Sequence, residues 1–458
     1  MFGRPHPIST TNAPAPTPAR RRRRGCLRRS LDGLIVDGMP GDSIAAGFER
    51  WKPPFSAIQS RPAMIPDIRH AYNAAFSLDR YEALMHDLER DAGCPAGFRI
   101  CETPLFLSAA LTGELIEAAH DVLAAVTSEE YLKVADRAVP PGLAVPGEEE
   151  HTIFLQVDFA LVRGEDGNLT PRLIELQGFP SLYGFQWLLE KEFRSHFPAI
   201  PEGFTPYFGG LDSETYPALL RDVIVGDCEP ENVVLLEIEP ERQKTRIDFC
   251  ATEQLLGIKT VCATGVVERG GRLFYPDGGR EVPIHRIYNR VIFDELERKG
   301  IDLSHIFRRE LDVTWVGHPN WYLKISKFSL PFIKSRWCPP AYFVSDLAEP
   351  PEDLENYVLK PLFSFAGLGV EMGPTRERLR SLTRPEDFIL QRKVAYAPAF
   401  ETPDEPAKGE IRMMFLWQDR PRLVNNLVRM SKGTMMGVDF NKDRTWIGSS
   451  LAYHPLLS

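Results

Sequence analysis

The chain has 458 residues with 43% hydrophobic and 26% charged residues, a composition typical of folded proteins and not of disordered ones. This length exceeds what one hydrophobic core supports and predicts two or three packed lobes. No apolar run reaches the about 18 residues that cross a bilayer, so neither a transmembrane helix nor a membrane partner is predicted.

Residues 1–63 are basic, with 11 Lys+Arg against 4 Asp+Glu, whereas the whole chain has a net charge of −9. The acidic remainder argues against a nucleic-acid partner. Pro-, Thr- and Ala-rich sequence without a periodic apolar pattern predicts that 1–63 is a disordered extension. A basic arm that binds nucleic acid or anionic lipid is one interpretation. A dispensable extension before Met64 is the favoured one.

The seven cysteines are scattered, odd in number and without a Cys-x-x-Cys pair. Neither a disulfide framework nor a zinc site is therefore predicted. Free thiols of this kind favour a reducing cytoplasm as the location of the protein.

Residues 64–150 are expected to be mostly helical, because apolar residues in 111–123 recur at close to helical spacing. The periodicity then changes. Residues 154–162 predict a strand, 164–168 a turn and 173–177 the returning strand. A helix is expected from about Trp187 to His196.

The predicted hairpin places four polar side chains on one face. Asp-Gly is the preferred centre of a two-residue turn, and a turn centred on 166–167 puts Asp158 opposite Glu175 and Gln156 opposite Gln177. Facing carboxylates repel each other. A hard cation such as Mg²⁺ would remove that repulsion. The alternative is the solvated face of an edge hairpin.

Residues 226–316 alternate between strand and helix. Strands are predicted at 233–238 and 259–263, and a helix at 248–256 with Gly257 as its C-cap. A hairpin is expected over 264–283. These elements predict a small α/β lobe.

Residues 317–458 predict an α+β region with short strands. Lys360 ends a strand that begins at residue 357, and a loop with Ser364, Gly367 and Gly369 follows. Glycines let backbone amides approach an anion closely, and a lysine supplies a compact positive charge for phosphate. The P-loop signature is absent, so a surface β-turn is the alternative.

A second strand over 388–394 is expected to place Gln391 and Lys393 on one face. Arg412, in a strand over 410–417, would complete a phosphate clamp by bidentate pairing. A basic surface strand is the alternative for Arg422, Arg429 and Lys432.

Two segments resemble the glutathionylspermidine synthase family. VDFALVRGEDGNLTPRLIELQGFPSLYGFQW is similar to the family's Arg-x-Asp…Glu-x-Asn segment, and YVLKPLFSFAGLGVEM is similar to its Lys-Pro, Ser, Gly nucleotide loop. The resemblance covers 154–187 and 357–394. It implies an ATP-grasp fold in circularly permuted order, because the metal half precedes the lysine half. Nothing in the chain resembles the amidase domain of bifunctional members.

The resemblance implies an α+β and α/β architecture in four parts. A helical region over 64–150 precedes a metal-binding half over 151–225. A small α/β lobe over 226–316, similar to a pre-ATP-grasp lobe, precedes a nucleotide-binding half over 317–458.

The resemblance also implies roles for single residues. Asp158, Glu175 and Gln177 would hold Mg²⁺, with Mn²⁺ as an alternative ion. Gln156 stands where the family has Arg, and Gln177 where it has Asn. The implied ATP contacts are Lys360, Ser364, Gly367, Gly369, Gln391, Lys393 and Val394. Arg412 and Arg286 are the candidate catalytic residues. The strand over 285–290, which contains Arg286, resembles a family strand near the active site, with an ordinary amphipathic strand as the alternative.

The implied function is an ATP- and Mg²⁺-dependent ligase that joins a small-molecule or peptide carboxylate to an amine through an acyl phosphate. Two alternatives remain open. One is an ATP-grasp phosphotransferase that stops at a phosphorylated product, and the other is a catalytically degraded ATP-binding or regulatory protein. If the two segments form one site, the carboxylates of Asp158 and Glu175 should converge with the ammonium groups of Lys360 and Lys393.

Overall fold

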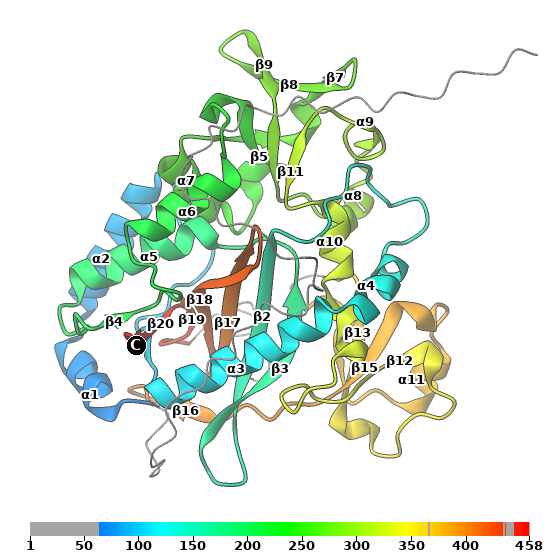
Figure 1. The fold of residues 1–458 in the computed structure, drawn as a ribbon. Helices are drawn as coiled ribbons and strands as arrows, with labels where there is room; N and C mark the ends of the chain where they lie inside the picture. Colours follow the sequence, from blue (N-terminus) through cyan, green and yellow to red (C-terminus); the bar gives the residue numbers. More distant parts are fainter. Residues whose placement is uncertain (1–63, 365–366, 434–435, 437–443, 458) are drawn as a thin grey trace, which may run out of the picture. The chain divides into compact units, whose positions relative to one another are not determined.

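The central element of the fold is a six-stranded antiparallel sheet in the order β19-β18-β17-β2-β3, with β16 paired to β17 (Figure 1). Its strands are β2 (Phe154–Arg163), β3 (Leu169–Gln177), β16 (Pro398–Phe400), β17 (Ala407–Trp417), β18 (Pro421–Ser431) and β19 (Gly448–Ser450). In this computed structural model the described residues are 64–364, 367–433, 436 and 444–457. The predicted extension over 1–63 lies outside them.

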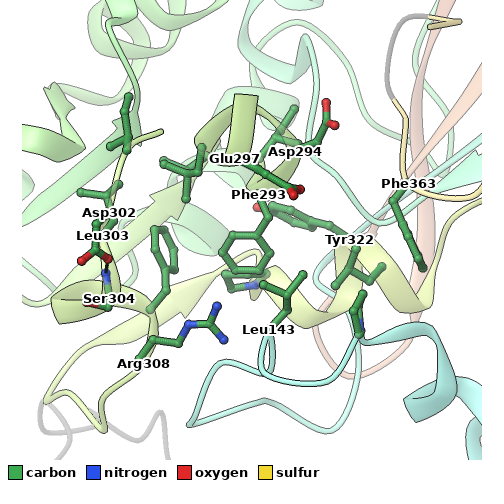
Figure 2. Close-up of a pocket in the computed structure, with 18 of the residues that line it drawn as sticks. Leu143, Phe293, Asp294, Glu297, Asp302, Leu303, Ser304, Arg308, Tyr322 and Phe363 are labelled. Carbon is green, nitrogen blue, oxygen red and sulfur yellow. Dashed lines mark hydrogen bonds between the residues drawn. The ribbon is translucent and has the colours of Figure 1, made fainter. Parts of the chain in front are cut away.

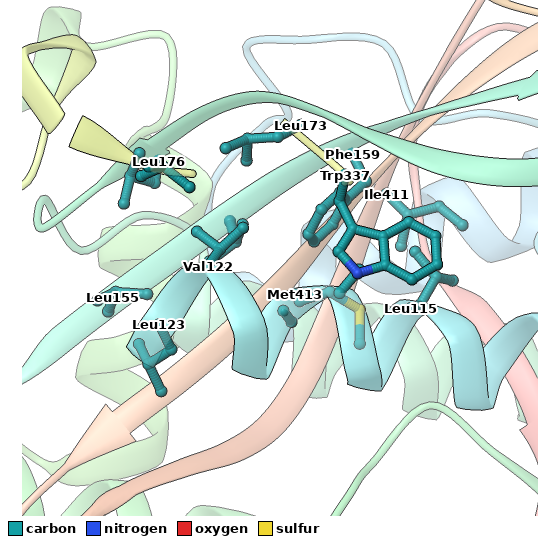
Figure 3. Packing of buried hydrophobic residues seen from close by; sticks show 14 of the residues in the cluster. Leu115, Val122, Leu123, Leu155, Phe159, Leu173, Leu176, Trp337, Ile411 and Met413 are labelled. Carbon is teal, nitrogen blue, oxygen red and sulfur yellow. The ribbon is translucent and has the colours of Figure 1, made fainter. Parts of the chain in front are cut away.

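One face of this sheet packs against helix α3 (Ala109–Val126), which includes the predicted helical segment 111–123. The side chain of Ser108 accepts a hydrogen bond from the amide of Leu111 and so caps the first turn. The apolar side of α3 meets alternate residues of β2, β3 and β17 (Figure 3). The residues at this contact include Leu115, Val122, Leu155, Phe159, Leu173 and Met413. This core directs the intervening residues of the strands to the opposite face.

The register of β2 and β3 places Asp158 opposite Glu175 and Gln156 opposite Gln177, which confirms the predicted facing pairs. The predicted two-residue turn is wrong, because β2 ends at Arg163 and β3 begins at Leu169. Residues 164–168 form a longer loop, in which the amide of Asn168 donates to Asp166 Oδ1 at 3.0 Å.

A β-bulge in β3 reconciles this loop with the predicted facing pairs. The register shifts between Asp158 and Phe159, so that Phe159 faces Leu173 and Ile174 is the additional residue. The amide of Leu173 donates to the carbonyl of Trp337 at 2.8 Å, outside the sheet. Because the loop has an odd number of residues, Asp158 and Glu175 would lie on opposite faces in a regular ladder. The bulge places them on the same face.

The other face of the sheet is apolar at one end, where Met414, Leu416 and Leu427 join a core formed with helices. The helices around this core are α1 (Pro66–Ala75), α2 (Leu78–Ala92), α5 (Tyr183–His196), α6 (Thr215–Ile224) and α7 (Arg246–Leu256). Asp248 on α7 accepts hydrogen bonds from the amides of Leu182 and Phe185 at the start of α5. The predicted helix from Trp187 therefore begins four residues earlier, at Tyr183.

The segment predicted as a small α/β lobe contains two further sheets. One is parallel with the order β11-β10-β5-β6, and the other is antiparallel with the order β7-β8-β9. The strands are β5 (Val233–Glu237), β6 (Lys259–Cys262), β7 (Val267–Arg269), β8 (Arg272–Asp277), β9 (Arg280–Ile284), β10 (Arg286–Asn289) and β11 (Thr314–Val316). Helix α7 ends at Gly257, whose φ of 73° is the left-handed C-cap that the sequence predicts.

A third sheet of four antiparallel strands carries the predicted lysine segment, in the order β12-β15-β13-β14. Its strands are β12 (Ala341–Phe343), β13 (Tyr357–Pro361), β14 (Glu371–Met372) and β15 (Phe388–Arg392). Gln391 faces Val358, which lies two residues before Lys360, so Gln391 and Lys360 share one face. Lys393 follows the end of β15.

The remaining strands form a three-stranded sheet, β1-β20-β4, from β1 (Leu105–Phe106), β4 (Phe204–Thr205) and β20 (Ala452–Pro455). The other helices are α4 (Glu129–Ala135), α8 (Phe293–Lys299), α9 (Ser304–Phe307), α10 (Pro319–Lys324) and α11 (Arg376–Arg380). In the part of the chain that the structure describes, every helix is too short or too polar to cross a membrane.

Cys94 and Cys250 form a disulfide, with Cα atoms 6.6 Å apart, which corrects the prediction of free thiols. Cys94 follows α2 and Cys250 lies on α7, two helices that pack together. Their separation of 156 residues hid this pairing from an argument based on local cysteine spacing.

Reduction of this disulfide is expected to lower the free energy of unfolding by about 2–5 kcal/mol, because it removes a cross-link from the unfolded chain. Urea denaturation with and without dithiothreitol measures the effect. Cys250→Ser should lower stability to a similar extent and should make it insensitive to the reductant. Equal stability of the oxidised and reduced protein would contradict the prediction.

Candidate functional site

The polar half of the sheet face is centred on an ion pair between Asp158 on β2 and Arg412 on β17. The two residues are direct cross-strand partners. Arg412 Nε lies 2.6 Å from Asp158 Oδ1, and Nη2 lies 2.7 Å from Oδ2. Both residues are buried. This bidentate geometry is the favourable arrangement for an arginine and a carboxylate.

The two glutamines of the hairpin complete the surroundings of Arg412. Its Nη1 donates to Gln156 Oε1 at 3.0 Å. The amide of Gln177, oriented so that its oxygen faces the guanidinium, accepts from Nη2 at 2.5 Å and from Nη1 at 3.2 Å. A guanidinium has five N–H donors. All five are therefore directed at oxygens of Gln156, Asp158 and Gln177.

A second arginine links Asp158 to another buried acid. Arg429 on β18 donates to Asp158 Oδ2 at 2.7 Å and also to Glu410 on β17. Tyr396 donates to the other carboxylate oxygen of Glu410 at 2.5 Å. Burial raises the pKa of Glu410. Burial opposes the charge of Arg429, but Glu410, Asp158 and Glu175 outweigh it and raise the pKa of Arg429.

The third sheet contacts this site through Lys360. Its Nζ donates at 3.1 Å to the carbonyl of Ile174, the additional residue of the bulge. On the same face, Gln391 Nε2 lies 3.5 Å from the carbonyl of Leu173. Burial lowers the pKa of Lys360, and Glu175 opposes this effect. The bulge thus provides acceptors for two residues that the sequence assigned to nucleotide binding.

Lys327 is a further buried cation. It lies next to the glycine loop, where its Nζ donates to the carbonyl of Ser364 at 2.5 Å. Ser364 Oγ is buried and has no hydrogen-bond partner within the described residues. Gly367 and Gly369 have positive φ angles of 75° and 73°. A hydroxyl without a partner beside a buried lysine is a donor that a ligand oxygen could use.

Glu175 is the least engaged acid of the site, because its carboxylate has no hydrogen bond to any described residue. Burial opposes its ionisation, but Lys327, Lys360 and the two arginines outweigh this effect and lower its pKa to about 2. Glu175 is therefore ionised at neutral pH.

The implied magnesium ion does not fit this arrangement. An ion bound by Asp158 and Gln177 would lie about 2.1 Å from their oxygens. Nitrogens of Arg412 approach the same oxygens to 2.5–2.7 Å. Asp158 Oδ2 and the Gln177 oxygen each already accept two hydrogen bonds from arginines, so an ion bound by both residues would have to displace Arg412. Glu175 is the predicted ligand that remains available.

Other predicted site residues lie apart from this cluster. Lys393 is exposed, and its Nζ donates to the carbonyl of Glu355. The expected convergence therefore holds for Lys360 but not for Lys393. Val394 follows β15 and is half-buried. Arg286 lies in the parallel sheet of the small lobe, where it donates to the carbonyls of Val223 and Ile224 at the end of α6. These bonds give Arg286 a helix-capping role.

Lys327 is not among the site residues predicted from the sequence. Its signal is a single charged residue within the otherwise uncharged run ISKFSLPFI. A lysine in such a run is buried only where a carboxylate or a ligand offsets its charge. The sequence does not show that Glu175 is the acid whose charge acts on Lys327.

A pocket of about 490 Å³ lies beside the glycine loop (Figure 2). Residues of α8, α9 and α10 line it together with Leu143 and Phe363, the residue before Ser364. Arg308 and Arg384 provide positive charge, and Asp294, Glu297, Asp302 and Asp387 provide negative charge. Its lining does not include Asp158, Glu175, Lys360 or Arg412, so this pocket and the charged cluster are separate features.

Asp87 on α2, with Glu192 and His196 on α5, forms a second group of potential metal ligands. Their ligand atoms lie within 4.8 Å of one another. His196 Nε2 already lies 3.1 Å from Asp87 Oδ2. The trio is therefore held together without an ion.

No protein-family model matches the chain, and no curated protein matches it. Among solved structures, a glutathione synthetase-like effector from Globodera pallida, in its apo form, is similar with 10% sequence identity. The match covers 86% of this chain and 100% of the effector, with a TM-score of 0.49. A similarity of this size establishes neither a family nor an activity.

Replacing Arg412 with methionine is expected to lower the free energy of unfolding by about 3–5 kcal/mol, because Asp158 would remain buried without its bidentate partner. Urea denaturation measures the loss. The matched control is Arg392→Met, which removes an exposed ion pair with Asp353 and should cost less than about 1 kcal/mol. Equal losses in the two variants would disprove the prediction.

The pH dependence of stability should depend on Glu175. Its folded pKa of about 2 lies below the unfolded value, so its contribution is present above about pH 4.3 and is lost as the pH falls towards 2. Between pH 5 and 2.5, Glu175→Gln should lose about 2 kcal/mol less than the parent protein. Urea denaturation at both pH values tests this, with the exposed Glu130→Gln as control.

Proposed function

We propose that the protein is an ATP-dependent ligase that joins a carboxylate to an amine, on an ATP-grasp fold in circularly permuted order. One observation carries the proposal: Lys360 Nζ contacts the bulge carbonyl of Ile174, next to Glu175. Lys360 and Ile174 are 186 positions apart in the sequence. The contact joins the two segments that resemble one nucleotide site.

The charges around this contact support an anionic ligand. Lys327, Lys360, Arg412 and Arg429 carry four positive charges against the three of Asp158, Glu175 and Glu410. Ser364 Oγ adds a buried donor without a partner among the described residues. A surplus of buried positive charge beside a glycine loop favours phosphate groups.

In the proposed reaction, Lys360 and Lys327 hold the phosphates of ATP while a substrate carboxylate attacks the γ-phosphate. The amine then displaces phosphate from the acyl phosphate and an amide remains. Positioning and charge neutralisation carry this chemistry, so no protein nucleophile is required. Magnesium bound by Asp158 and Gln177 is not part of the proposal, because Arg412 already contacts both residues.

A binding or regulatory protein is the second candidate function. The observation that favours it is the saturation of Arg412, whose five donors are all directed at protein oxygens. An arginine in this state offers no donor to a transferring phosphoryl group. Such a protein would bind nucleotide without turnover.

The experiment is a screen of acid–amine pairs with the purified full-length protein and ATP, with ADP and phosphate as readouts. Stoichiometric release that requires both acid and amine would establish a ligase. A phosphorylated product that forms without amine would establish a phosphotransferase instead. Nucleotide binding without release would favour the regulatory protein, and no nucleotide binding at all would refute the proposal.

Lys360→Met is expected to lower kcat/KM by about 100-fold or more, because a preorganised charge at the phosphates is lost. The matched control is Lys133→Met, which removes an exposed lysine of α4 that lies 3.7 Å from Glu129. Steady-state kinetics with ATP as the varied substrate measures both. Equal activity of the two variants would show that Lys360 does not contact the nucleotide.

A further inference from the structure

We infer that the guanidinium of Arg412 takes the place of the divalent cation at Asp158, so that this site binds its anionic ligand without a metal ion bound to Asp158 and Gln177. The inference rests on the proposed function only for the identity of the ligand as ATP. The exclusion of a metal from Asp158 stands on the geometry of the sheet alone.

Side-chain oxygens of three residues surround the guanidinium of Arg412. Asp158 and Gln177 are two of the three predicted metal ligands, and Gln156 lies beside them on the same face. All three direct side-chain oxygens at one guanidinium, at 2.5–3.2 Å. Oxygens gathered around a central cation are the ligand set of a hard metal ion. Here the central cation belongs to the protein.

Charge also disfavours a metal ion at Asp158. Asp158 accepts from Arg412 twice and from Arg429 once, so its negative charge is offset within the protein. A metal ion at this position would have to displace a buried guanidinium that is bonded through all five donors. At Glu175 no described residue donates a hydrogen bond to the carboxylate, and the two lysines and two arginines act on it through their charges alone.

Arg412 also accounts for the arginine that this chain lacks at position 156. Gln156 stands where the resembling family has an arginine, and its Oε1 accepts from Arg412 on the neighbouring strand. The positive charge that is absent from position 156 of β2 is therefore supplied by β17. Because β2 and β17 are adjacent, this exchange leaves a guanidinium next to Asp158.

The first test measures ATP binding by calorimetry to the full-length protein, in EDTA and in excess MgCl₂. The expected dissociation constants agree within about threefold. A loss of affinity of tenfold or more in EDTA that Asp158→Asn abolishes would overturn the inference. Absence of binding in both conditions would refute the proposed function, and the second test would then decide the inference alone.

The second test measures Mn²⁺ binding by electron paramagnetic resonance in the His196→Ala background, which removes the separate cluster of Asp87, Glu192 and His196. The inference predicts that Mn²⁺ stays free, or binds equally well when Asp158→Asn is added. One bound ion whose dissociation constant rises tenfold or more with Asp158→Asn would overturn it.

A gain-of-binding variant separates this role from simple structural support. In the same background, Arg412→Gln should bind Mn²⁺ at least tenfold more tightly than its parent, and Asp158→Asn should abolish the gain. A folded Arg412→Gln protein without the gain would count against the inference. The matched control is Arg429→Gln, which leaves the bidentate pair in place and should produce no gain.

Discussion

The rest of the site depends on one buried ion pair, between Asp158 and Arg412 in the middle of the large sheet. A carboxylate at this depth is tolerated only with a partner of good geometry, since an unpaired buried charge costs several kcal/mol. The pair fixes the neighbouring side chains as well, because Gln156 and Gln177 must offer oxygens to the remaining donors of the arginine. Polar residues on three adjacent strands, β17, β2 and β3, thereby form one network.

The bulge in β3 connects this network to the third sheet. β3 is an edge strand of the large sheet, so its outward-facing carbonyls have no ladder partner. At the bulge, the carbonyl of Ile174 accepts from Lys360. Lys360 is consequently held beside Glu175, and two sheets from distant parts of the chain contribute to one cluster.

The sequence predicted the hairpin, its facing pairs and the lysine strand from strand alternation. The facing pairs hold because the bulge at Ile174 compensates for a loop that is longer than the predicted turn. The sequence did not predict the partner of Asp158. That partner lies 254 residues away on a strand whose place in the sheet no local pattern reveals. The same reason explains the missed disulfide and the unassigned role of Lys327. The prediction that Lys393 converges with the acids was wrong. β15 ends at Arg392, one residue earlier, so strand alternation does not determine the direction of the Lys393 side chain.

The contact of Lys360 with Ile174 is related to the number of residues in the loop over 164–168. A hairpin loop with an odd number of residues brings the acids onto one face only if one strand carries an additional residue, which here is Ile174. A loop with an even number of residues would align them without it, and Ile174 would then face Phe159 in a regular ladder. The length of a solvent-exposed loop is thus linked, across the hairpin, to the backbone geometry of the residue that contacts Lys360.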